Sequence, residues 1–172
     1  CVISQFLNSA DWRIVRVLQT GGLGADDALL LPASAASGAR SRLVTFNGTA
    51  AQLWDLDTGE QVAAFRGPLA VGKVAVTRTN DHSLIATGGQ TLRIFNSLES
   101  SDQFGQPLFR FRHPHPGRVT STAFSPADPD LLASAGADGS VALWKWLRNE
   151  HRAELVRTVG RFGSPIVSIV WS

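Results

Sequence analysis

Residues 43–55 read LVTFNGTAAQLWD, and this stretch decides the fold. It holds two strand-like runs joined by a short turn, and it ends in the dipeptide Trp54-Asp55. The same pattern of strand, turn and strand recurs along the chain. Alignment of the last aromatic residue of each copy gives spacings of 48, 41 and 49 residues between Phe6, Trp54, Phe95 and Trp144. The chain is therefore expected to consist of structural repeats.

Repeats of about 40 to 45 residues with this ending are typical of the four-stranded blades of a β-propeller. Loop insertions explain the two longer intervals. Period-two alternation and turn residues divide the last full repeat into strands at 119–124, 131–135, 141–146 and 155–159. Prolines end the first of these strands, and the Asp138-Gly139 turn joins the second to the third.

The earlier repeats divide in the same way. Strands are expected at 73–77, 83–87, 91–95 and 108–111, and before them at 28–31, 42–46, 50–56 and 61–65. We predict an all-β propeller segment of three complete four-stranded blades with partial blades at both ends. Within one domain, the boundaries are 1–20 for the end of a blade, 28–66, 73–112 and 118–160 for complete blades, and 165–172 for the first strand of the next.

Three blades cannot close a ring, because propellers typically have about 4 to 8 blades. The chain begins at Cys1, contains no Met and stops one strand into a blade. Closure also protects strand edges from unwanted pairing. We therefore expect the remaining blades to lie in the same polypeptide or in another chain.

Composition agrees with a globular β module. The chain is 44% hydrophobic and 17% charged, and no apolar run approaches the roughly 20 residues of a membrane span. Its single cysteine excludes an internal disulfide framework, and no signal-peptide pattern is visible. These features predict an intracellular protein of the cytoplasm or nucleus, without a membrane partner.

The last repeat resembles the WD-repeat β-propeller family through Gly139, Val141, Leu143 and Trp144, and the resemblance covers almost the whole chain. The segment Phe124-Ser125-Pro126 and the earlier Trp54-Asp55 dipeptide add to it. In that family, a His before the first strand, a Ser or Thr on the second, an Asp in the turn and a Trp on the third are hydrogen bonded. Matched by position, the resemblance implies a structural network of His115, Ser134, Asp138 and Trp144.

This network is chemically reasonable, because carboxylate, imidazole, hydroxyl and indole groups can satisfy one another when buried. Ser134, His115 and Asp138 are also the residue types of a hydrolase triad. Nothing in the sequence resembles a nucleophile elbow, so we predict no enzyme and no cofactor. His113 and His115 lack a nearby Cys partner, so we predict no metal site.

The other repeats depart from the pattern. Thr45 and Asn47 are expected to substitute in part in the first complete blade. The next blade has Thr87, but it carries Gly89-Gln90 where the Asp would stand and Ala70 where the His would stand. These two blades are expected to depend more on apolar packing.

A narrower resemblance involves residues 84–95, 51–55, 58–60 and 8–12. They resemble the group of WD-repeat proteins that includes the serine/threonine kinase receptor-associated protein, also called unrip, and the i subunit of eukaryotic translation initiation factor three. This resemblance implies a non-catalytic scaffold for protein–protein interactions in a multi-subunit assembly, in ribonucleoprotein assembly or translation.

In a four-stranded meander, the loops that join strand four to strand one and strand two to strand three lie on one face. We call this the basic loop face, because it is expected to gather Arg66, Lys73, Arg112, His113, His115, Arg118 and Arg161 against only Asp26, Asp27 and Asp138. Such a face predicts, as an alternative function, binding of RNA or a phosphopeptide. The net charge of only +2 leaves a second interpretation open, in which these charges only keep the surface hydrated.

Three aromatic residues are further candidates for partner binding. Trp12 lies at a turn, Trp146 follows the third-strand Trp, and Phe104 lies in the polar insertion 97–107. Exposed aromatic residues are enriched in interface hot spots. The alternative is that Trp12 and Trp146 pack against a neighbouring blade and that the insertion covers a blade edge. The expected partners are other protein subunits.

Overall fold

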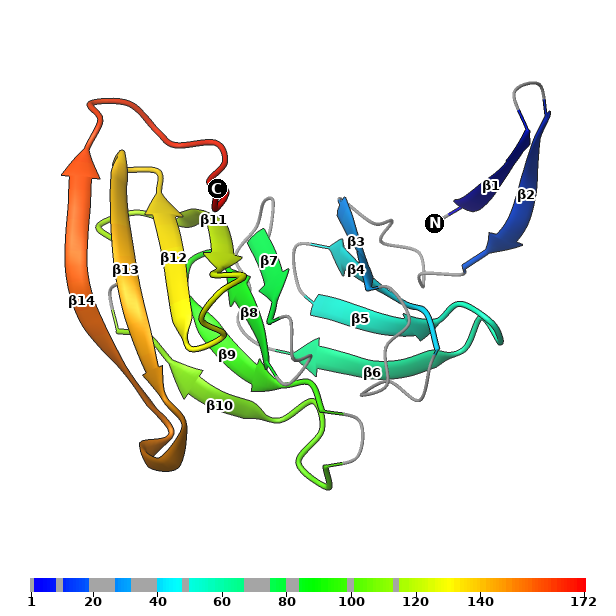
Figure 1. Ribbon diagram of the computed structural model, residues 1–172, viewed down its shortest axis with the longest axis horizontal. Coiled ribbons are helices and arrows are strands. Elements are labelled where there is room, and N and C mark those ends of the chain that lie inside the picture. The colour runs from blue at the N-terminus through cyan, green and yellow to red at the C-terminus, as the bar shows by residue number, and fades with distance from the viewer. Residues whose placement is uncertain are drawn as a thin grey trace.

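The computed structural model describes residues 2–8, 11–18, 27–31, 40–47, 50–66, 75–79, 84–98, 101–112 and 115–172. These residues form antiparallel β-strands and one short 3-10 helix, η2 (Arg148–Glu150) (Figure 1). The predicted all-β fold is confirmed.

Three four-stranded sheets follow one another along the chain, each a meander in which successive strands are hydrogen-bonded neighbours. We call them the first (β3–β6), second (β7–β10) and third (β11–β14) sheets, and a separate hairpin, β1–β2, precedes them. The strands are β1 (Val2–Asn8), β2 (Asp11–Val17), β3 (Asp27–Leu31), β4 (Arg42–Asn47), β5 (Ala50–Asp55), β6 (Gln61–Arg66), β7 (Ala75–Arg78), β8 (Leu84–Gly88), β9 (Arg93–Asn96), β10 (Pro107–Arg110), β11 (Val119–Phe124), β12 (Leu131–Gly136), β13 (Ser140–Leu147) and β14 (Arg152–Arg161).

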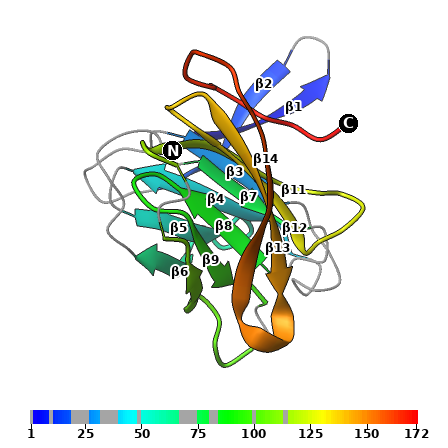
Figure 2. The same cartoon turned by 90° about the vertical axis from the view of Figure 1, so that its left-hand side faces the viewer.

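The three sheets stand side by side, with β3, β7 and β11 toward the middle of the molecule and β6, β10 and β14 toward its outside (Figure 1). Seen from the side, β14 is the outermost strand of the third sheet (Figure 2). A backbone hydrogen bond also links the second and third sheets, because the N–H of Val119 donates to the carbonyl of Gly89 at 2.6 Å.

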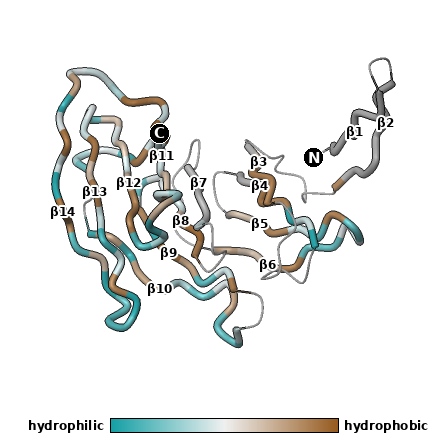
Figure 3. Tube along the Cα trace, in the orientation of Figure 1, coloured by the Kyte–Doolittle hydropathy of each residue, from teal (hydrophilic) through white to brown (hydrophobic). Residues whose placement is uncertain are grey.

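Strand β8 shows why the sheets pack in this way. All five of its residues are buried, and their side chains alternate between the two neighbouring sheets. Leu84 and Ala86 belong to the apolar cluster shared with the third sheet, whereas Ile85 belongs to the cluster shared with the first. In Figure 3 the hydrophobic colour follows β8 and β9, and the hydrophilic colour gathers at the β13–β14 hairpin.

The insertion between β9 and β10 covers the first sheet. The ring of Phe104 meets Phe65 edge-on at a centroid distance of 6.2 Å, and Phe65 meets Phe95 at 5.5 Å. This arrangement favours the alternative that the insertion covers a blade edge, and partner binding through Phe104 stays a prediction. Its side chain is partly buried against the apolar cluster that contains Phe65 and Phe95.

The sequence predicts the first strand of a further blade at 165–172, but the structure forms no strand there. Two contacts that involve side chains hold this segment beside β11. The N–H of Ile169 donates to Ser121 Oγ at 3.1 Å, and Trp171 Nε1 donates to the carbonyl of Ala123 at 2.9 Å. A strand requires repeated pairing between two backbones, and none of the described strands pairs with this segment in that way.

Phe104→Ala is expected to lower the free energy of unfolding by about 1–2 kcal/mol. A fully buried Phe→Ala change costs roughly 3–5 kcal/mol, and Phe104 is only partly buried. Phe162→Ala is the control, because this ring is 63% exposed and its loss should cost less than about 0.5 kcal/mol. Urea unfolding followed by tryptophan fluorescence measures both, and equal losses would show that the insertion does not stabilise the first sheet.

Candidate functional site

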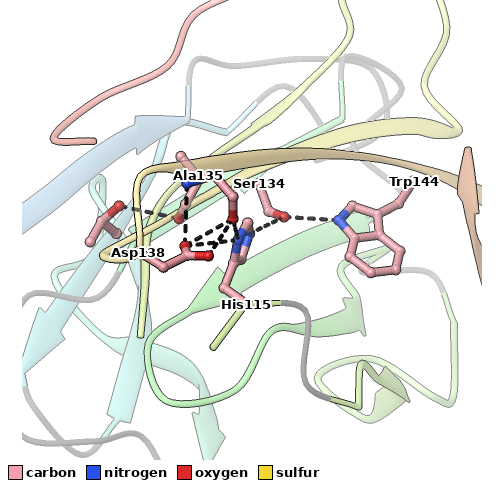
Figure 4. A network of polar contacts seen from close by, with 7 residues as sticks. His115, Ser134, Ala135, Asp138 and Trp144 are labelled. Carbon is pink, nitrogen blue, oxygen red and sulfur yellow. Dashed lines mark hydrogen bonds and ion pairs between the residues drawn. The ribbon is translucent and has the colours of Figure 1, made fainter. Parts of the chain in front are cut away.

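A buried polar network lies at the boundary between the second and third sheets (Figure 4). Ser134 of β12 and Trp144 of β13 come from adjacent strands, and Trp144 Nε1 donates to Ser134 Oγ at 2.8 Å. His115, from the segment before β11, places Nε2 2.8 Å from the same hydroxyl. Its Nδ1 lies 2.6 Å from Ser140 Oγ, and that hydroxyl lies 2.7 Å from an Asp138 carboxylate oxygen.

The directions of these hydrogen bonds follow from the groups themselves. The Asp138 carboxylate can only accept, so the Ser140 hydroxyl donates to it. The oxygen of Ser140 then accepts from His115 Nδ1–H, which leaves Nε2 as the acceptor for the Ser134 hydroxyl. The oxygen of Ser134 accepts from Trp144 Nε1–H. One neutral imidazole tautomer therefore satisfies all five side chains.

The pKa values agree with this assignment. Burial, which outweighs the attraction of Asp138, lowers the pKa of His115 below its ordinary 6.5 and favours the neutral ring. Burial alone would raise the pKa of Asp138, but hydrogen bonds from Ser140 and the charge interaction with His115 hold it below 3.8. The carboxylate is therefore charged and the imidazole neutral near pH 7.

Gly136 leaves the space that this network needs. A Cβ atom on Gly136 would lie 2.2 Å from Asp138 Oδ1 and 2.6 Å from His115 Cγ, closer than any ordinary contact. The backbone can therefore approach the network closely at Gly136, because this residue has no side chain.

Four of these side chains were expected from the sequence, whereas Ser140 was not. The structure brings His115, Ser134 and Trp144 into direct contact and places Ser140 between His115 and Asp138. His115 Nδ1 and Asp138 Oδ1 are 3.5 Å apart, so the hydroxyl carries the contact. The sequence does contain a sign of this role. Ser140 is a second hydroxyl residue, it directly follows Asp138-Gly139, and it begins a strand whose side chains alternate between inward and outward.

The first sheet has a reduced version of the network. Trp54 Nε1 donates to Thr45 Oγ1 at 2.7 Å, both residues being buried. Asp55 points elsewhere: its carboxylate bonds the buried guanidinium of Arg42 and accepts the backbone N–H of Asp57 at 2.8 Å. The Trp54-Asp55 dipeptide thus fixes the sheet with one residue and the following turn with the other.

The second sheet has the hydroxyl but not its partners. Thr87 stands where Ser134 and Thr45 stand in the other sheets, and its cross-strand neighbourhood has Phe95 in place of Trp. Its Oγ1 is buried and has no hydrogen-bond partner among the residues that the structure describes. An unsatisfied buried hydroxyl destabilises the fold.

The predicted partner-binding residues differ in how far the structure exposes them. Arg112, Arg118 and Arg161 are exposed, as a basic rim requires. Trp146 is only 2% exposed, and its ring packs against that of Phe109 at a centroid distance of 5.9 Å. Its candidate role as a surface anchor is therefore corrected, because the side chain packs inside the protein. Lys73 and His113, and the side chains of Arg66 and Trp12, lie outside the described residues.

A pocket of about 690 Å³ opens between the end of the second sheet and the segment that leads into the third. Four of its lining residues have polar or charged side chains, namely Gln90, Thr91, Arg110 and Arg112. Phe111 and His115 complete the wall. The pocket therefore adjoins the buried network, and its charged groups are arginines.

Within the described ranges, no three His, Cys, Asp or Glu side chains are grouped as ligands of a metal ion. The described part of the chain also has no helix of the length and apolarity needed to cross a membrane.

Comparisons with known proteins show which fold the chain has. No family model matches the chain. The probable cytosolic iron-sulfur protein assembly protein CIAO1 of Homo sapiens is 38% identical over 69 residues, which cover 38% of this chain and 20% of that protein. The crystal structure of RRP9 WD40 repeats is similar with a TM-score of 0.70 at 18% identity, covering 89% of this chain and 43% of that one. The structure of U3-55K gives 0.68 at 18% identity, covering 89% and 44%.

The chain has the WD-repeat β-propeller fold and forms a segment of such a propeller. The resemblance to this family is confirmed at the level of the fold. The chain spans less than half the length of the two similar structures and about a fifth of the curated relative. The narrower resemblance to unrip and the i subunit of eukaryotic translation initiation factor three stays a prediction.

Ser134→Ala and Thr87→Val should change stability in opposite directions. Ser134→Ala leaves the imidazole and the indole N–H without their shared partner, so the free energy of unfolding should fall by about 2–4 kcal/mol. Thr87→Val removes an unsatisfied hydroxyl at nearly constant shape and should be neutral or stabilising by up to about 1 kcal/mol. Denaturant unfolding of both variants measures this, and a large loss in Thr87→Val would reveal a partner for its hydroxyl.

Acid should destabilise the protein through His115 before it affects Asp138. Below pH 6.5 the unfolded chain binds a proton that the folded chain resists, so stability is full above this value and falls as the pH drops below it. Asp138 contributes only nearer pH 3.8 and below. The fall in melting temperature from pH 7 to pH 5, measured by circular dichroism, should shrink in His115→Gln. The exposed His151→Gln control should retain it, and an undiminished fall in His115→Gln would contradict the assignment.

Proposed function

We propose that the chain is part of a non-catalytic scaffold that mediates protein–protein interactions in a multi-subunit assembly. The observation that carries this proposal is the exposed apolar surface of β14 and the turn after it. Leu155, Val156, Val159 and Phe162 are between 48% and 63% exposed. Consecutive strand side chains point to opposite faces, so these groups leave both faces of the edge strand β14 available for contact with a further blade or with another protein.

The residues that resemble a hydrolase triad support the same proposal. Both ring nitrogens of His115 are occupied by serine hydroxyls, and the Ser134 hydroxyl is shared between His115 and an indole. Its residue is fully buried. A serine in this position has no access to a substrate carbonyl, so its groups stabilise the fold.

The expected setting is ribonucleoprotein assembly or translation, inside the cell in the cytoplasm or nucleus. The narrower sequence resemblance supports the process, and the single cysteine supports the compartment. The human relative is itself described as an assembly protein, which supports the broader idea of a role in building a complex. The partners are other protein subunits, and the remaining blades come from the same polypeptide or another chain.

A second candidate function is binding of RNA or a phosphopeptide through the basic loop face. The observation that favours it is the exposure of Arg112, Arg118 and Arg161 near the ends of β10, β11 and β14. None of these three has an ion pair within the described part of the chain.

The scaffold proposal predicts stoichiometric partners. The tagged complete polypeptide, isolated from its own cells and cross-linked, should carry a defined set of proteins joined to residues near β14. Leu155→Glu with Val159→Glu should reduce their recovery at least about tenfold, because each change places a charge on an apolar contact. Arg157→Gln on the same strand is the matched control. Recovery of the polypeptide alone, or equal recovery from all variants, would contradict the proposal.

A further inference from the structure

The pocket beside the buried network has the dimensions of a ligand site. Its volume of about 690 Å³ lies in the range of roughly 300–1,000 Å³ seen for small-molecule and side-chain pockets. Phe111, which is buried, gives it an apolar wall, and Gln90 and Thr91 give it neutral hydrogen-bonding groups.

Its arginines are placed against one another. Arg110, which lines the pocket, stands directly opposite Arg93 in the β9–β10 ladder. Like charges in this arrangement destabilise a sheet. Arg112 lines the same pocket two residues further on, and Arg110 and Arg112 are both exposed. Three guanidinium groups therefore lie at one end of the second sheet.

No carboxylate balances them within the residues that the structure describes. Asp55 pairs with Arg42, Asp128 with Lys145 and Asp130 with Arg148, but Arg93, Arg110 and Arg112 form no such pair. In the third sheet, the equivalent turn contributes Asp138, whereas the second sheet has the uncharged Gln90. Burial, and after it the charge of Arg110, lower the pKa of Arg93. The positive charge at this pocket is therefore not neutralised by a carboxylate of the described residues.

His115, which forms part of the pocket wall, adds no further positive charge. Its ring nitrogens are both engaged by Ser134 and Ser140, and burial keeps the ring neutral. A single carboxylate would offset one of the three guanidinium charges. A phosphate monoester carries about −1.5 to −2 and has three acceptor oxygens, which suits paired arginines and the hydroxyl of Thr91.

We propose that this pocket binds the phosphate group of a phosphorylated serine or threonine in a protein partner. The inference rests on the proposed scaffold function and names the chemistry by which one partner is recognised. RNA is the less suitable ligand, because an RNA backbone needs several phosphate contacts along a surface.

Fluorescence polarisation tests the proposal with four labelled probes and the complete polypeptide. The probes are degenerate nine-residue peptide pools with central phosphothreonine, threonine or glutamate, and a twelve-nucleotide poly(U) RNA. Only the phosphothreonine pool should bind well. Arg110→Gln and Arg112→Gln should each weaken this binding by about tenfold or more, since hydrogen bonds between charged groups are the strong ones. Arg157→Gln, which alters an exposed arginine of β14, should leave it unchanged.

Stability separates a binding role from a structural one. Arg110→Gln removes the repulsion with Arg93, so its melting temperature should stay constant or rise while binding falls. Gln90→Glu should do the same, because it adds the missing carboxylate to an exposed position in the pocket. Loss of binding only in variants that also lose stability would overturn the proposal.

The remaining outcomes also decide whether the phosphate-binding proposal and the scaffold proposal hold. Equal binding of the phosphothreonine and glutamate pools, or of the phosphorylated and unmodified pools, would overturn it, as would arginine-dependent binding of poly(U) alone. If no pool binds but stoichiometric partners still copurify, this inference fails and the scaffold proposal stands. If the phosphothreonine pool binds as expected but no protein copurifies, the scaffold proposal fails instead.

Discussion

The structure depends on the burial of the middle, second sheet from both sides. Strand β8 sends Ile85 toward the first sheet and Leu84 and Ala86 toward the third, so neither face is left for water. A polar side chain on such a strand must find its hydrogen-bond partner inside the protein. The hydroxyl residue that each sheet carries at the same place, Thr45, Thr87 or Ser134, therefore determines how polar that interface can be.

The three sheets meet this requirement to different degrees. In the third, Ser134 belongs to a chain of five side chains in which the proton on each donor has an acceptor. In the first, Trp54 is the hydrogen-bond partner of Thr45 among the described side chains. In the second, Phe95 cannot donate, and the described residues leave the Thr87 hydroxyl unpaired. The second sheet also carries the Arg93–Arg110 pair, so its local choices agree least with the fold.

Sequence alone predicted the strands within one to three residues, because alternation and turn chemistry are local. It also named most of the third-sheet network, because a family pattern fixes those positions. It missed Ser140, whose role appears only when the Asp138 turn is folded back toward His115. It could not place Phe104 against Phe65, since that contact joins residues 39 positions apart through a loop of no regular pattern. The strand expected at 165–172 failed because pairing requires a partner that local pattern cannot supply.

The basic loop face shows why the number of charges is a weaker guide than their pairing. A net charge of +2 suggests nothing unusual, and the basic residues Lys145 of β13 and Arg148 of η2 are balanced by Asp128 and Asp130. The meander, however, brings the turn after β8 and the end of β10 to the same end of the second sheet. Arginines gathered there have no carboxylate partner among the residues that the structure describes, and the sheet loses stability by keeping two of them opposed. Natural proteins tend to depart from local consistency at functional sites, which makes this pocket, and not the fully satisfied Ser134 network, the place where recognition is to be sought.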